Sequence, residues 1–178
     1  NINTFRYVSQ HTNLDTYVID VPDRYSPEAL EYVTMQLKEL IQKLKALTGK
    51  RLSMDDLSET LVRENQSKAY YKEFLKLQTE RYYPSTLTLQ MYMLFATHLN
   101  IGTQETLELF RSFAEDIKQY PKYDGTRIVW VHLLPFYQET LKHYFNLSRD
   151  YQIQCTEMNL DYMDELDTDH PLEALATK

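Results

Sequence analysis

The sequence predicts a helix-rich α/β protein, in which a helical connector is followed by the start of a parallel α/β lobe of the Rossmann or flavodoxin type. From about residue 27 to residue 120 the apolar residues recur at helical spacing. After Gly125 the pattern changes to two short β-type runs, 127–131 and 151–156, with a helical segment between them. The order strand, helix, strand is that of a βαβ unit, whose strands are parallel and whose crossover is right-handed.

The first elements expected along the chain are a strand and a long helix. The β-branched, apolar run at 16–21 predicts a buried strand that Pro22 ends. Ser26 is a good N-cap and Pro27 suits the first helical position, so a helix is expected over 27–48. Gly49 then stops that helix, because glycine readily adopts the left-handed conformation of a helix C-terminus.

Three further helices are expected before the change of pattern. Ser53 caps a helix over about 54–81, which Pro84 ends, and Thr103 caps another over about 104–120. The helix between them, 86–99, is so apolar that we expect it to be the most buried of all. A shorter helix is expected from about residue 137 to residue 145, and the segment from Pro171 onward resembles the first turns of one more.

Composition excludes several classes of function. The net charge of −7 argues against nucleic acid as a partner, because phosphates would be repelled. The single cysteine, Cys155, excludes an internal disulfide framework and any multi-cysteine metal or iron–sulfur site built from this chain alone, and it suits a small buried residue in a reducing cytoplasm. No run approaches the length of about 20 apolar residues that spans a bilayer, so no membrane role is expected, and with only 3 glycines no glycine-rich nucleotide loop is possible.

Polar residues follow both predicted strands of the second half of the chain. His132 comes directly after the strand 127–131, and Glu157 and Asn159 come after the strand 151–156. Because parallel α/β sheets bind ligands at the carboxyl ends of their strands, we expect these side chains at one edge, with Tyr137 close by. His132 and Glu157 are the candidate catalytic groups, and Tyr137 and Asn159 the candidate substrate-binding groups. The alternative is a loop histidine with a structural hydrogen bond, beside polar residues that are common at any strand end.

The order and spacing of several segments resemble the central part of a known family. The segments are Tyr17-Val18-Ile19-Asp20-Val21-Pro22, Leu47-Thr48-Gly49-Lys50, Glu64-Asn65, Pro84-Ser85-Thr86-Leu87-Thr88, Gly125-Thr126-Arg127-Ile128, Glu157-Met158-Asn159-Leu160-Asp161-Tyr162 and Pro171-Leu172-Glu173-Ala174-Leu175-Ala176. Together they look like the 2-hydroxyglutaryl-CoA dehydratase D-component family, which also includes subunits of benzoyl-CoA reductase. The resemblance covers nearly the whole chain.

This resemblance implies a lyase that removes water from (R)-2-hydroxyacyl-CoA thioesters. An ATP-dependent iron–sulfur activator would deliver one electron, a ketyl radical would form on the thioester, and a second dehydratase subunit or domain would be a partner. The family's cysteine-ligated four-iron four-sulfur cluster is expected in the full-length parent and not in this fragment. The family's cluster cysteines lie before and after the region present here, and Cys155 matches none of their motifs.

The chain begins with Asn1 rather than Met, and we expect it to be a fragment, inactive alone, possessing parts of two lobes. Residues 1–22 would be the last strand of an upstream α/β lobe, 23–124 a helical region, and 125–178 the start of a second α/β lobe. The parent could be a dehydratase fused to its activator. The alternative function is a non-catalytic interaction or regulatory module with the same fold, and cluster cysteines on both flanks would distinguish the enzyme from it. A third alternative, an unrelated helical binding domain, requires the two late strands to be wrong.

Overall fold

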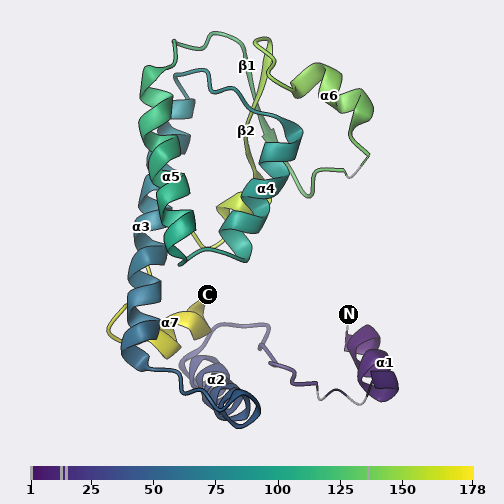
Figure 1. Cartoon of the computed structure of the whole chain (residues 1–178), viewed down its shortest axis with the longest axis vertical. Helices are drawn as coiled ribbons and strands as arrows, with labels where there is room; N and C mark the ends of the chain where they lie inside the picture. Colours follow the sequence, from purple (N-terminus) through teal and green to yellow (C-terminus); the bar gives the residue numbers. More distant parts are fainter. Residues whose placement is uncertain (1, 13, 15, 136) are drawn as a thin grey trace.

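A computed structural model describes residues 2–12, 14, 16–135 and 137–178 of the chain (Figure 1). It confirms a helix-rich α/β fold with a small parallel sheet. In chain order the elements are α1 (Ile2–Thr12), α2 (Pro27–Thr48), α3 (Met54–Gln78), α4 (Leu87–His98), α5 (Gln104–Asp116), the 3₁₀ helix η1 (Ile117–Gln119), β1 (Thr126–Trp130), α6 (Glu139–Phe145), β2 (Tyr151–Thr156), the 3₁₀ helix η2 (Glu157–Leu160) and α7 (Pro171–Thr177).

The expected helix caps are present. The Ser26 hydroxyl accepts a hydrogen bond from the Ala29 N–H at 3.1 Å at the start of α2, and Gly49 ends that helix with φ 69°. Ser53 and Thr103 cap α3 and α5 in the same way as Ser26 caps α2. The helices α2, α3, α4 and α5 therefore begin where the sequence predicts, within a residue, and the C-terminal helix α7 is also confirmed.

The main core lies between α3, α4 and α5. Figure 1 shows α3 as the long helix on which α5 packs side by side, while α4 leans towards the sheet. The Tyr71 and Phe110 rings stack with centroids 4.8 Å apart, and the Phe74 and Phe113 rings lie 5.5 Å apart, so α3 and α5 run parallel. Phe110 has no exposed surface. Burial of such large apolar side chains is the main source of stability for this part of the chain.

Among helices α2 to α5, helix α4 buries the largest share of its side chains, as expected for 86–99. It buries Leu87, Gln90, Met93 and Ala96, but Tyr92 is 64% exposed and Phe95 44% exposed. Helix α3 buries 7 of its 25 side chains, a smaller share than the 4 of 12 that α4 buries. The apolar character of α4 is distributed all round the helix, and the described residues cover only one face of it.

The predicted pair of parallel strands is confirmed. β1 and β2 pair with Ile128 opposite Ile153, and the register shifts at the next position, where Val129 lies opposite Cys155. The other edge of β2 is occupied by side chains from the helices. The amide groups of Gln78 and Gln90 both donate to the Ile153 carbonyl oxygen, at 3.5 Å and 3.3 Å. The sheet of the described residues therefore contains two strands.

The buried strand expected at 16–21 is not formed. Residues 16–22 are extended but have no sheet partner among the described residues, and Val18 is 48% exposed. A side chain replaces the missing strand: the Gln36 amide accepts from the Asp20 N–H and donates to the Asp20 carbonyl oxygen, both at 2.8 Å. Helix α1, which sequence patterning did not predict, precedes this segment and lies apart from the other helices in Figure 1.

The C-terminal segment folds back onto α3 (Figure 1). Asn65 both donates to and accepts from the main chain of Leu166, at 2.8 Å and 2.9 Å. Glu64 Oε1 lies 2.8 Å from Lys68 Nζ and 2.8 Å from Lys178 Nζ. Burial alone would raise the pKa of Glu64, but hydrogen bonds from Lys178 and Lys68 outweigh it and lower the pKa below its ordinary value. This ionic cluster holds α7 against α3.

None of the helices in the described part of the chain is both long enough and apolar enough to cross a membrane.

Candidate functional site

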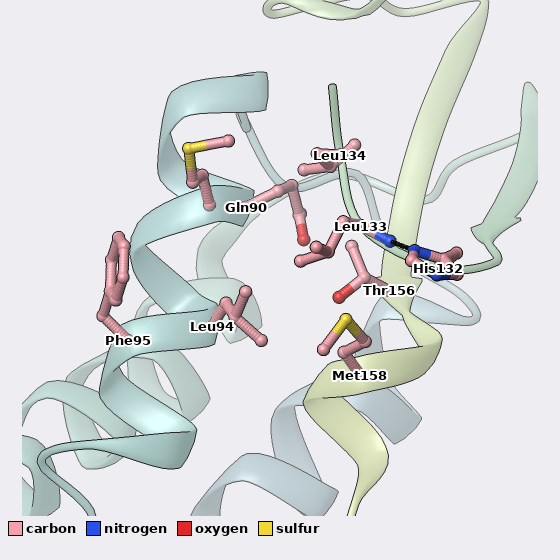
Figure 2. A pocket seen from close by; sticks show the side chains of 9 residues that line it. Gln90, Leu94, Phe95, His132, Leu133, Leu134, Thr156 and Met158 are labelled. Atoms are coloured by element: carbon pink, nitrogen blue, oxygen red, sulfur yellow. Dashed lines mark hydrogen bonds between the residues drawn. The ribbon is translucent and has the colours of Figure 1, made fainter. Parts of the chain in front are cut away.

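A cavity of about 210 Å³ lies between α4 and the carboxyl ends of both strands (Figure 2). Three segments form its wall: one face of α4, the loop that follows β1, and the junction of β2 with η2. Its lining side chains are mostly apolar and none is a lysine, arginine, aspartate or glutamate. They are Gln90, Met91, Leu94, Phe95, His132, Leu133, Leu134, Thr156 and Met158.

Two polar groups point into this cavity. Figure 2 shows the side-chain oxygens of Gln90 and Thr156 in the space between α4 and β2. The Gln90 nitrogen is already used, because it donates to the Ser85 hydroxyl at 3.0 Å and to the Ile153 carbonyl oxygen. These bonds fix the orientation of the amide and leave its oxygen as an acceptor with no partner among the described residues. The cavity thus offers hydrogen bonds to a neutral ligand.

His132 lies at the rim of the cavity, farthest from α4 in Figure 2. It follows β1 in a left-handed conformation with φ 70°, which costs a non-glycine residue of the order of 1 kcal/mol. The neighbouring main chain compensates: the Leu133 N–H donates to His132 Nδ1 at 2.7 Å. Because an N–H can only donate, Nδ1 must be unprotonated, and in the neutral ring the proton lies on Nε2. The ring is therefore set to donate a hydrogen bond from Nε2.

Glu157, the first residue of η2 directly after β2, stabilises this turn. Its Oε2 accepts the His132 main-chain N–H at 3.0 Å, so the two residues share one edge, and both are exposed, as the βαβ topology predicts. Their chemical roles remain predictions. Within this arrangement the Glu157 carboxylate orients the His132 loop.

The two other candidate residues lie elsewhere. Asn159 was expected at the shared edge, but it is fully buried and its side-chain oxygen accepts from the Thr97 hydroxyl at 3.5 Å. The reason is the turn of η2, which directs Asn159 inward instead of continuing the strand. Tyr137 is 96% exposed, next to a residue outside the described part of the chain, and is not among the residues that line the cavity.

Sequence reasoning missed the contribution of α4. Gln90, Met91, Leu94 and Phe95 supply one wall of the cavity, although they precede the strands by more than thirty positions in the sequence. A signal was present in the run of apolar residues from Met91 to Phe95, which continues round the helix and exceeds what one packed helix face requires. An apolar helix that is only partly covered indicates a ligand or a partner surface.

The donor set of this chain does not fit a four-iron cluster. Such a cluster needs several thiolates, and the one thiol, Cys155, is buried within β2, where burial raises its pKa above the ordinary value. Across residues 2–12, 14, 16–135 and 137–178, no three His, Cys, Asp or Glu side chains gather in a way that could hold a metal ion.

A comparison with known protein families gives a match along the whole chain. The family model described as "2-hydroxyglutaryl-CoA dehydratase, D-component" matches residues 1–178, the whole of the chain. A search of the curated proteins found no match.

Proposed function

The chain belongs to the D-component family of 2-hydroxyglutaryl-CoA dehydratase, and from this premise we propose that the protein containing it removes water from an (R)-2-hydroxyacyl-CoA thioester. The observation that supports this proposal is the cavity at the strand ends. It combines an apolar body, two hydrogen-bonding oxygens and a histidine at its rim. A 2-hydroxyacyl thioester has matching parts: an alkyl chain, a hydroxyl group and a carbonyl group.

The chemistry explains why a carbonyl-binding donor matters. Water loss removes the hydroxyl from C2 and a proton from C3, and the carbonyl of the thioester does not acidify the C3 hydrogen directly. One electron added to the thioester carbonyl gives a ketyl radical, from which hydroxide can leave C2. The overall loss of water is neither an oxidation nor a reduction, so the electron is recovered at the end. A donor at the carbonyl oxygen stabilises the negative charge that develops there.

We assign that donor to His132. Nε2 carries the ring proton because Nδ1 accepts the Leu133 N–H, and Nε2 has no hydrogen-bond partner among the described residues. Glu157 acts as a positioning residue, because its carboxylate holds the main chain of His132. The Gln90 oxygen can accept from the 2-hydroxyl group of the substrate. Tyr137 stays a predicted contact for the part of the thioester outside the cavity.

The remaining parts of the reaction lie outside this chain. We propose that an ATP-dependent iron–sulfur activator supplies the electron, and that the four-iron cluster and a second dehydratase subunit or domain belong to the longer protein. In that protein the edge with His132 would face an upstream α/β lobe, of which residues 1–22 form the end. The region 23–124 would connect it to the second lobe, which begins at residue 125.

Replacement of His132 by Gln in the complete, activated enzyme tests the assignment. We expect turnover to fall by about 100-fold, in the range that loss of an oxyanion donor produces, with little loss of thermal stability. His143→Gln, on the exposed surface of α6, is the matched control and should leave turnover unchanged. Equal losses of turnover and stability in His132→Gln would make His132 a structural loop residue. A complete protein that turns over no 2-hydroxyacyl-CoA, and lacks cluster cysteines, would instead be a non-catalytic interaction module.

A further inference from the structure

We propose that the substrate of this protein has an uncharged, apolar acyl side chain, which occupies the α4 cavity. This inference rests on the proposed function and adds to it the substrate class. The family description refers to an acyl group with a terminal carboxylate, whereas the cavity of this chain has the chemistry of a site for an alkyl or aromatic group.

Charge is the first reason. A glutaryl-type acyl chain would bring its terminal carboxylate into the cavity, and no lysine or arginine lines its wall among the described residues. Removal of a carboxylate from water is costly unless a cation or several donors replace the water. Glu157, which accepts the main-chain N–H of the rim residue His132 at 3.0 Å, is itself acidic. It would repel a second carboxylate.

Shape is the second reason. A cavity of about 210 Å³ exceeds the roughly 150 Å³ that accommodates a benzene molecule in a protein interior. It can therefore hold a branched alkyl or a phenyl group. Leu94 and Leu133 project into it from opposite walls in Figure 2, and the flexible Met158 side chain lies beside them. Thioether side chains adapt to apolar ligands of different outline.

A matched pair of thioesters tests the proposal on the complete, non-activated protein. In (R)-2-hydroxy-5-methylhexanoyl-CoA two methyl groups replace the two carboxylate oxygens of (R)-2-hydroxyglutaryl-CoA, so the compounds differ in charge and hardly in shape. We expect calorimetry to show at least about 100-fold tighter binding of the methyl compound. Equal binding, or tighter binding of the glutaryl compound, would overturn the inference while leaving the dehydratase proposal intact. Binding of neither compound would overturn both.

A cation placed in the wall should weaken the preference for the uncharged compound. Leu94→Lys, or Phe95→Lys at a position that is already 44% exposed, should reduce the preference by about tenfold or more, because the new ammonium group can pair with the carboxylate. Tyr92→Lys adds the same charge to the same helix at a residue outside the cavity lining, and it should leave the preference unchanged. If Phe95→Lys and Tyr92→Lys give the same ratio of affinities as the unsubstituted protein, the acyl group binds elsewhere.

Discussion

Substitution of Glu64 by Gln is expected to destabilise the chain strongly, because it leaves a buried ammonium group without a counter-ion. The side chains of Glu64 and Lys68 are 4% and 3% exposed, and their charged atoms lie 2.8 Å apart. In the Gln variant Lys68 keeps only neutral partners, among them the Asp164 carbonyl oxygen at 3.0 Å. Removal of one partner of a buried pair typically costs about 3–5 kcal/mol, and we expect a loss in this range.

Two further variants make the test specific. Glu59→Gln removes a carboxylate that is 73% exposed and 3.9 Å from Arg63, and it should cost about 0–1 kcal/mol. The double variant Glu64→Leu with Lys68→Met replaces the buried pair with apolar groups and should recover most of the loss. Urea unfolding followed by circular dichroism gives the three free energies. Equal losses in Glu64→Gln and Glu59→Gln would refute the claim that burial makes the Glu64 cluster important.

The same cluster predicts a pH dependence. The folded-state pKa of Glu64 is lowered, so its stabilisation is fully present above the unfolded-state pKa of about 4.3 and is lost as the pH falls through the folded-state pKa. The difference in unfolding free energy between the unsubstituted chain and Glu64→Gln should therefore be largest near neutral pH and shrink in acid. A difference that stays constant down to strongly acidic pH would contradict this linkage.

Two other predictions concern the ends of helices. Gly49→Ala should lower the unfolding free energy by about 1 kcal/mol. Gly49 has φ 69° and an added Cβ would meet no atom within 4 Å, so the loss comes only from the left-handed backbone conformation, which alanine disfavours. Gly49→Asn should cost less, because asparagine tolerates this conformation better. Asp167 accepts a hydrogen bond from His170 and so raises the pKa of that imidazole above its ordinary value. In an NMR titration, Asp167→Asn should lower the pKa of His170, and it should lower it more than Glu173→Gln does. An equal shift in both variants would show that the overall negative charge of the segment, and not the hydrogen bond to Asp167, raises the pKa of His170.

Local features of the fold were predictable because their causes lie within a few residues. Ser26, Ser53 and Gly49 determine where helices begin and end through contacts with the adjacent turn. The two β-type runs pair because a short crossover brings neighbouring strands together. The segment 16–21 has the same composition as a strand, but a strand also needs a neighbour, and here Gln36 provides the main-chain hydrogen bonds instead.

The candidate site was predictable only in part, for a similar reason. Topology placed His132 and Glu157 at one edge, because the ends of paired strands are neighbours. The approach of α4 to that edge depends on long-range packing, including the contact of Leu87 with Leu134 and Ile153 in one buried cluster. No local pattern encodes such packing. Asn159 was predicted at the exposed edge but is buried, because the 3₁₀ turn η2 changes the direction of its side chain and has no distinctive sequence signal.

Two glutamine side chains, Gln78 from α3 and Gln90 from α4, determine which edge of the sheet could pair with another strand. A strand that approached β2 from its outer side would have to remove the Gln78 and Gln90 donors from the Ile153 carbonyl oxygen and displace the helices that carry them. No partner among the described residues occupies the other edge of β1. Any strand that pairs with this sheet would therefore be expected beside β1 rather than beside β2. The same donors protect β2 from pairing with the exposed strand of another molecule, which is how many proteins avoid edge-to-edge aggregation.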